Sequence, residues 1–185
     1  PDGPDPDNYE KINAHCDVLV DGGGPAGLAA ASEAGKTGCR VIFVDDQQEF
    51  GGSLLTTSDS ITNMPGTEWV SEKISELKNM PEVTMLNRST ASGYYDHNFV
   101  TVVERLRDHM PGSQSNTIRQ RLWKIRAKQV ILATGAIERP LLFNNNDKPG
   151  IMLASAVSTY LNRYSVKPGS RAVIFTNNDS AYTTA

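Results

Sequence analysis

Residues 18–31 read VLVDGGGPAGLAAA: an apolar run, three glycines spaced as Gly-x-Gly-x-x-Gly, and an alanine-rich stretch. This order predicts a strand, a tight turn and a helix, the arrangement that lays a dinucleotide pyrophosphate across a helix N-terminus. Gly22 permits the turn, Gly24 lets the backbone approach the phosphates, and Gly27 lets the helix pack closely on the strand. Pro25 falls at the first helical position, where its missing N–H costs least.

The alanine-rich stretch predicts a helix over residues 25–37, which Gly38 ends. A second apolar run follows at residues 40–44, RVIFV, and predicts a buried parallel strand. The strand runs into Asp45 and Asp46. An acid at such a strand tip can accept hydrogen bonds from the hydroxyls of an adenosine ribose. No arginine follows directly, and two acids would repel a ribose 2′-phosphate, so the sequence favours NAD or FAD over NADP.

Further candidate contacts follow at strand ends. Gly51-Gly52 allows a loop to fold back over a cofactor, and Ser53 can offer a hydroxyl and an N–H to a phosphate. A third parallel strand is expected at residues 83–86, and residues 89–91 after it lie at the sheet edge where an adenine would bind. A later strand at residues 130–135 ends in a small turn suited to a pyrophosphate or ribose. The predicted cofactor-binding residues are Gly22, Gly24, Pro25, Ala26, Gly27, Asp45, Asp46, Gln47, Gly52, Ser53, Ala91, Thr134 and Gly135.

The rest of the pattern predicts an α/β fold, a Rossmann-like βαβ domain with a parallel sheet and an inserted antiparallel β-meander. A helix is expected over residues 67–79 with Thr67 as its N-cap, and the meander over about residues 92–127 with strands at 99–105 and 118–125. A helix at 154–164 and a strand at 171–176 follow.

These elements divide the chain into three parts. Residues 1–13 are expected to be a linker, residues 14–143 the dinucleotide-binding domain, and residues 144–185 a connector with the truncated start of a second domain. Because the chain begins with proline rather than methionine, we expect a fragment or a processed chain.

Composition narrows the function classes. The 185 residues carry a net charge of −3 and an isoelectric point near 5.6, which argues against a nucleic-acid surface. No apolar run of about 18 residues and no signal pattern is present, so a soluble, cytoplasmic chain without a membrane segment is expected. Cys16 and Cys39 form no redox pair and are interpreted as structural thiols. The three histidines have no metal-ligand spacing, and no metal is predicted.

No general acid, base or nucleophile is predicted. Tyr94, His97 and Glu138 qualify by residue type alone, and we interpret them as loop or surface residues. Asp21 is unusual, because the position before the first glycine lies in the strand and is ordinarily apolar. A carboxylate there must face solvent, find hydrogen-bond donors, or cost stability.

Several motifs together carry a family resemblance. The glycine motif, Gly51-Gly52 and the segment Ala133-Thr134-Gly135, with a meander between them, resemble the two-dinucleotide-binding flavoprotein superfamily. Within it, the segment ATGAIERP at residues 133–140, with PGIM at 149–152 and TNNDSA at 176–181, resembles the α subunits of heterotetrameric sarcosine oxidases. The resemblance covers nearly the whole chain from about Tyr9.

The resemblance implies a segment of a larger subunit. Enzymes of that family oxidise sarcosine to glycine and form hydrogen peroxide, and the one-carbon unit goes to tetrahydrofolate or leaves as formaldehyde. The family's α subunit holds NAD, while FAD and FMN lie elsewhere in a complex with β, γ and δ subunits. By resemblance, Ala26 and Gly27 approach the pyrophosphate, Asp45, Asp46 and Gln47 surround the ribose, and Ser53 lies near the phosphates. Asp21 and Gln47 depart from the family pattern.

Two other functions are compatible with the residues. FAD and NAD share the ADP half that the glycine motif recognises, so the chain could be the FAD-binding half of a flavin-dependent amine or amino-acid dehydrogenase. Asp21 motivates the other possibility, a non-catalytic structural domain with a degenerate site. Flavin absorbance would distinguish the flavin-dependent dehydrogenase from the NAD-binding segment. Failure to bind any adenine dinucleotide would favour the structural domain.

Overall fold

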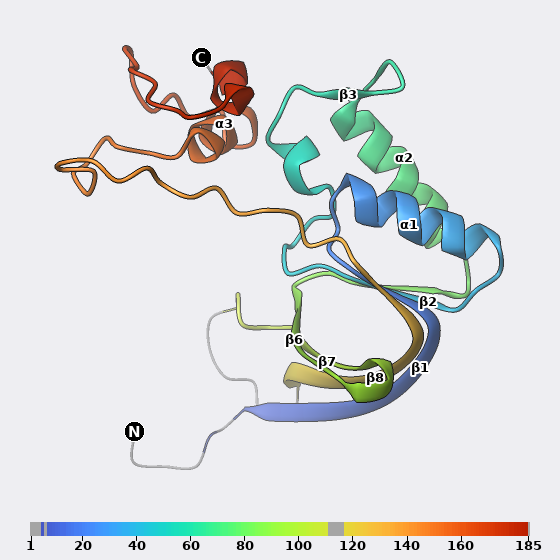
Figure 1. Ribbon diagram of the computed structural model, residues 1–185. Coiled ribbons are helices and arrows are strands. Elements are labelled where there is room, and N and C mark those ends of the chain that lie inside the picture. The colour runs from blue at the N-terminus through green and yellow to red at the C-terminus, as the bar shows by residue number, and fades with distance from the viewer. Residues whose placement is uncertain (1–4, 6, 111–116, 185) are drawn as a thin grey trace.

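The computed structural model describes residue 5, residues 7–110 and residues 117–184. In this part of the chain, six strands form one sheet in the order β5-β2-β1-β8-β7-β6, and β3 and β4 form a separate small hairpin (Figure 1). The elements in chain order are β1 (Asn8–Asp21), α1 (Pro25–Lys36), β2 (Val41–Val44), η1 (Gly52–Leu55), β3 (Ser60–Ile61), β4 (Met64–Pro65), α2 (Gly66–Lys78), β5 (Val83–Leu86), β6 (Ser89–Tyr95), η2 (Asp96–Asn98), β7 (Phe99–Arg105), β8 (Ile118–Leu132), α3 (Ala154–Asn162) and η3 (Asp179–Thr184).

The predicted βαβ unit and its third strand are confirmed. β1, β2 and β5 are parallel, and both connecting helices, α1 and α2, cover the same face of the sheet (Figure 1). Val20, Phe43 and Leu77 are fully buried in the core between that face and the helices. Phe50, in the loop after β2, stacks on Phe43 with ring centroids 4.6 Å apart and closes this core near the strand tips.

The meander covers the opposite face of the sheet. β6, β7 and the first part of β8 are antiparallel, and Val102 and Ile125 pack with Leu19 and Val44 from the parallel strands. Cys16 belongs to this core, and burial raises the pKa of its thiol to about 11, as expected for a structural rather than a reactive cysteine.

The strands expected at 118–125 and 130–135 are one continuous strand, β8, which ends at Leu132. β8 pairs in parallel with β1 along both strands, while β7 pairs only with residues 120–126 on its other side. The expectation of two strands was wrong because β1 supplies hydrogen-bonding partners past the point where the meander ends. One strand therefore belongs to both the meander and the parallel sheet.

Residues 8–13, expected in the linker, form the first part of β1; residues 1–4 and 6 lie outside the described residues. Ion pairs hold this polar part of the strand to β8. Arg121 Nε lies 2.6 Å from Glu10 Oε2, and Arg119 pairs with Asp7. The partners are more than 100 residues apart in sequence, so the local composition, typical of a linker, gave no sign of the pairing.

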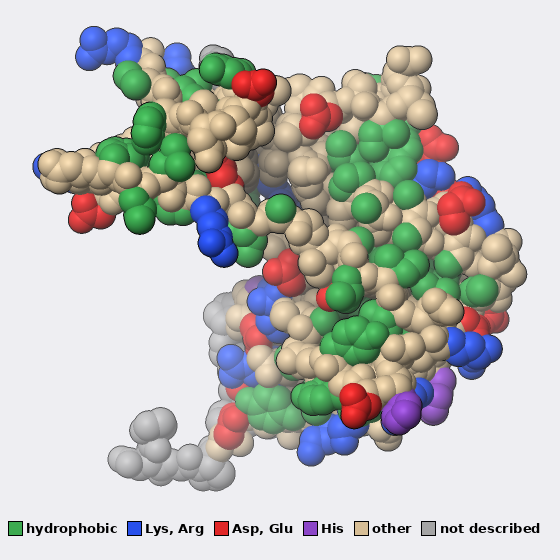
Figure 2. Space-filling view, in the orientation of Figure 1, with side chains coloured by type: hydrophobic (Ala, Val, Ile, Leu, Met, Phe, Trp, Pro, Cys, Tyr) green, Lys and Arg blue, Asp and Glu red, His purple; other side chains and the backbone are tan. Residues whose placement is uncertain are grey.

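Three smaller expectations also differ. β6 begins at Ser89, so residues 89–91 lie within a strand, and α2 begins at Gly66 with Pro65 rather than Thr67 at the N-cap. Residues 171–176 form no strand, and Val173 is 98% exposed, because the described part of the chain gives this run no neighbouring strand. Between the two expected meander strands, residues 111–116 lie outside the described residues. Figure 2 shows the segment after β8 standing away from the sheet, with a hollow between them.

Ile125→Ala tests whether the meander stabilises the sheet. Ile125 is fully buried between β8 and the parallel strands, so we expect the free energy of unfolding to fall by about 2–5 kcal/mol in urea titrations. Val173→Ala is the control and should change it by less than about 0.5 kcal/mol, because Val173 is exposed. Equal effects of the two substitutions would contradict this description of the core.

Candidate dinucleotide-binding site

Two glycines of the motif are required by the backbone itself. Gly22 has φ +111°, and a Cβ there would overlap the carbonyl group of Ala133, just after β8. A Cβ on Gly27 would overlap the carbonyl oxygen of Gly22, where α1 crosses the end of β1. These contacts account for both glycines without any ligand.

Gly24 differs from them. A Cβ there would meet only the Cα of Gly52, at 4.0 Å, so no packing within the described chain excludes a side chain. Gly24 is the N-cap of α1, no side chain caps the helix, and its first turn contains no acid. The first intrahelical bond is donated by Leu28 N–H, which leaves the N–H groups of Ala26 and Gly27 without helical partners. This open helix N-terminus suits an anion, and a closely approaching ligand would explain the glycine.

The second pair of glycines packs directly on the motif. Gly51 N–H donates to Gly23 O at 2.7 Å, and Gly52, with φ +54°, comes so close that its Cβ would lie 2.7 Å from the Cα of Gly24. Ser53 follows at the start of η1 with an exposed side chain. The structure therefore brings Gly52 and Ser53 beside the N-terminus of α1.

The two acids after β2 have different surroundings. Asp45 is buried, and its carboxylate accepts N–H hydrogen bonds from Gly23 and, at 2.8 Å, from Gln47. Burial raises the pKa of Asp45 although both N–H groups act to lower it. Asp46 and Gln47 are exposed, and Gln47 Nε2 donates to Asp46 Oδ1 at 3.0 Å. Asp45 thus fastens the glycine loop to the tip of β2, while Asp46 and Gln47 present their side chains to solvent.

Sequence reasoning missed the residues that hold this loop in place. Arg105, at the end of β7, donates from Nη2 to Asp46 O at 2.6 Å and from Nε to Arg88 O at 3.2 Å. Arg88 N–H donates to Gln47 O at 2.8 Å, and Asn87 Nδ2 to Gln48 O at 2.7 Å. The carbonyls of three consecutive loop residues are therefore bound by the β5–β6–β7 part of the chain. These contacts, which involve the side chains of Arg105 and Asn87 and the backbone of Arg88, span up to 59 residues and follow no local sequence pattern.

Ala91, Thr134 and Gly135 lie on different elements. Ala91 is half-buried on β6, on the meander side of the sheet. Thr134 and Gly135 are exposed in the segment after β8, where Ala133 N–H donates to Asp21 O at 2.7 Å and fixes that segment against the end of β1. The exposed candidates thus share the edge formed by the carboxyl ends of the parallel strands, and Ala91 approaches it from the other face.

The residues singled out by type alone have structural partners or exposed positions. Tyr94 O–H donates to Asn98 Oδ1 at 2.8 Å, His97 is exposed in a turn, and Glu138 Oε2 accepts the N–H of Ser155 at 2.9 Å near the start of α3. The described residues contain no group of three or more His, Cys, Asp or Glu side chains placed to hold a metal ion. Among the same residues, no helix has both the length and the apolar character needed to cross a bilayer.

Comparison with known proteins defines the class. Residues 16–174 match the model of the pyridine nucleotide-disulphide oxidoreductase family, and the chain belongs to that family. The crystal structure of L-proline dehydrogenase from P. horikoshii superposes on this chain with a TM-score of 0.69 and 27% sequence identity. The superposition covers 88% of this chain and 31% of the dehydrogenase chain. The α/β dinucleotide-binding fold expected from the sequence is therefore confirmed.

Two relatives are much closer in sequence. The chain is 50% identical over 181 residues to sarcosine oxidase subunit alpha of Rhizobium meliloti (strain 1021), and 49% identical over 180 residues to that of Corynebacterium sp. (strain P-1). These alignments cover 98% and 96% of the chain but 18% and 19% of the relatives, so the chain spans about a fifth of their length. The resemblance to sarcosine oxidase α subunits, and with it the oxidoreductase class, is confirmed.

The glycines give a paired test. Gly22→Ala should lower the free energy of unfolding by at least about 2 kcal/mol, because alanine would be strained at φ +111° and would overlap Ala133. Gly24→Ala should cost less than about 1 kcal/mol, the scale of an N-cap change. Urea unfolding without added ligand measures both, and comparable losses would refute the distinction between the two glycines.

Asp21→Asn should stabilise the protein at neutral pH. Burial, with repulsion from Asp45 and Asp46, raises the pKa of Asp21, so its charged form disfavours the folded state. The folded chain holds this proton more strongly than the unfolded chain, whose aspartate titrates at the ordinary value near 4, and stability is lost as the pH rises through the folded-state pKa. We expect Tm to rise by about 2–4 °C at pH 7.5, the shift that ~1 kcal/mol produces at this chain length. The gain should disappear near pH 4; a gain independent of pH would contradict the cause given.

Proposed function

We propose that this chain binds NAD along the carboxyl ends of β1 and β2, as a segment of an oxidoreductase that acts on sarcosine. The observation that carries the proposal is Gly24, which no contact among the described residues requires and which caps an open helix N-terminus. A pyrophosphate lying against this backbone would use the free N–H groups of Ala26 and Gly27 and would be excluded by a side chain at position 24.

The other candidate residues extend the same site in both directions. Pro25 begins the helix, and Gly52 and Ser53 would face the phosphates from the neighbouring loop. Asp46 and Gln47, exposed at the strand tip, would meet the ribose hydroxyls, while Asp45 keeps the loop in place and has further lone pairs to accept with. The backbone of Ala91 would meet the adenine, and Gly22, Thr134 and Gly135 would form the side of the site next to β8.

NAD is the proposed ligand for two reasons. Three carboxylates, Asp21, Asp45 and Asp46, repel one another here, and a ribose 2′-phosphate would add further negative charge. The resemblance to a family whose α subunit holds NAD supports the same choice. FAD is the second candidate, because the glycine motif recognises the ADP half that FAD and NAD share.

The activity proposed for the whole enzyme follows the relatives. Sarcosine would lose its methyl group to give glycine, two electrons would reduce O2 to hydrogen peroxide, and the one-carbon unit would form methylene-tetrahydrofolate or formaldehyde. FAD and FMN held elsewhere in the complex would supply the redox chemistry, and β, γ and δ subunits would be the partners. We assign no catalytic residue to this chain, whose part is to bind and orient a dinucleotide.

The test is the absorption spectrum of the purified protein, followed by identification of the nucleotide released on denaturation. Released NAD without flavin absorbance would support the proposal, whereas FAD would move the flavin-dependent dehydrogenase to first place. Gly24→Ala should reduce the bound nucleotide at least about tenfold with little loss of stability, because only the ligand contact is affected. If neither NAD nor FAD is released, and neither binds when added, the site is degenerate and the domain structural.

A further inference from the structure

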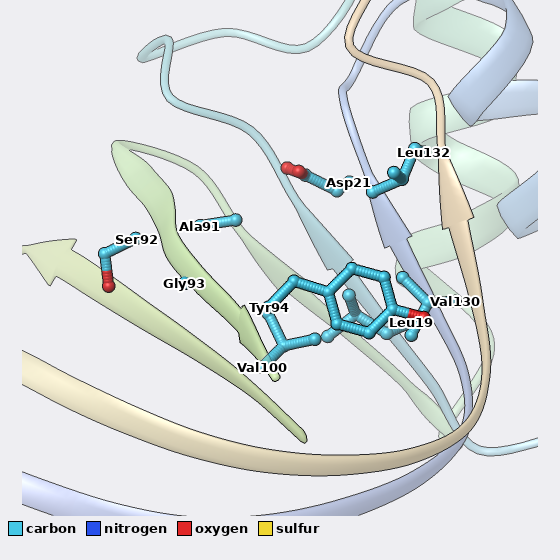
Figure 3. Close-up of a pocket in the computed structure, with 9 residues that line it drawn as sticks. All are labelled: Leu19, Asp21, Ala91, Ser92, Gly93, Tyr94, Val100, Val130 and Leu132. Atoms are coloured by element: carbon cyan, nitrogen blue, oxygen red, sulfur yellow. The ribbon is translucent and has the colours of Figure 1, made fainter. Parts of the chain in front are cut away.

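A small cavity lies on the meander side of the sheet, opposite α1. It is bounded by the end of β1, by β6 and by the last residues of β8, and has a volume of about 210 Å³ (Figure 3). Leu19, Tyr94 and Val130 form one end of it, and Asp21 projects into the space between Ala91 and Leu132. Asp21 is the only charged residue among those that line the cavity.

The alternation of β1 places this carboxylate. Leu19 and Asp21 face the meander, while Val20 between them faces the helices. Within residues 5, 7–110 and 117–184, no hydrogen bond or ion pair reaches the side chain of Asp21. The charges that act on it, Asp45 and Asp46, are both negative. The described residues therefore direct a half-buried anion into a cavity and provide no cation for it.

The remaining walls suit an alkyl group with a positive charge. The ring of Tyr94 is held in place by its hydrogen bond to Asn98 Oδ1, and an aromatic face attracts cations. Val130 and Leu132 add apolar surface. A volume of about 210 Å³ is enough for a small branched amine.

We propose that this cavity binds a small organic ammonium ion, with the charged nitrogen at Asp21 and the alkyl groups against Tyr94 and Leu132. Ala91 is the one lining residue that this cavity shares with the site proposed for NAD, and the cavity lies on the other face of the sheet from α1. It requires no dinucleotide. A cation at Asp21 would also reduce the repulsion among the three carboxylates, so the two ligands should bind together at least as tightly as each binds alone.

The probes are tert-butylammonium and its neutral isostere, tert-butanol, titrated into nucleotide-free protein by calorimetry and by NMR of the Tyr94 ring. The ammonium ion should bind at millimolar concentration or tighter, and tert-butanol at least about tenfold more weakly. Asp21→Asn, which is expected to fold more stably than the parent, should weaken the ammonium ion about ten- to a hundredfold, as expected for loss of a charged hydrogen-bond partner.

Three measurements test the site against general charge, against apolar binding alone and against the NAD site. Asp46→Asn removes a carboxylate outside the cavity and should weaken ammonium binding no more than about threefold. Tyr94→Leu should weaken the ammonium ion more than tert-butanol, because only the cation uses the aromatic face. Saturating NAD should leave ammonium binding unchanged or tighter.

Three outcomes would overturn the proposal. Equal affinity for tert-butanol would show an apolar cavity without charge recognition, and unchanged binding to Asp21→Asn would place the ammonium ion elsewhere. Displacement of the ammonium ion by NAD or FAD would make the cavity part of the adenosine site. Since the titration is carried out without nucleotide, failure of NAD binding would leave it interpretable.

Discussion

The parallel pairing of β1 with β8 is the constraint on which the rest of the structure depends. It joins residues 8–21 to residues 118–132, across about a hundred residues of chain, and places β8 between the parallel strands and the meander. The same pairing brings Ala133 against Gly22, which then has no room for a side chain. The turn that opens the glycine motif is thus shaped partly by a strand from the other end of the domain.

The sequence was sufficient where signals are local. The first strand, the glycine turn, α1, β2 and β5 follow from apolar runs, helix ends and glycine positions within windows of a few residues. The polar start of β1 and the unbroken course of β8 could not be predicted in this way, since each is stabilised by the other strand and by pairs such as Arg121 with Glu10. A strand whose partner is distant has the same local composition as a linker.

The candidate site shows the same division. Spacing alone identified the three motif glycines, each with its own role, and both acids, which it assigned together to the ribose. The structure separates glycines that the backbone needs, Gly22 and Gly27, from Gly24, which the backbone does not need. It also separates Asp45, whose oxygens are engaged by backbone N–H groups, from the exposed Asp46. Arg105, which holds the Asp46 carbonyl, had no signal in the sequence because its role depends on a contact 59 residues away.

Asp21 is the residue that departs most from what both the strand pattern and the stability of the fold require. Leu19 and Cys16 of β1 are buried in the core between the sheet and the meander. The strand pattern therefore predicts an apolar residue at position 21 as well. Within the part of the chain that the structure describes, a carboxylate at that position lacks N–H donors of the kind that satisfy Asp45, and it has two acids nearby. Stability alone would select against it, since an apolar side chain of similar size would remove the repulsion and fill the cavity. Residues that reduce stability in this way are common where a ligand supplies the missing partner, and the cavity beside Asp21 provides the room for one.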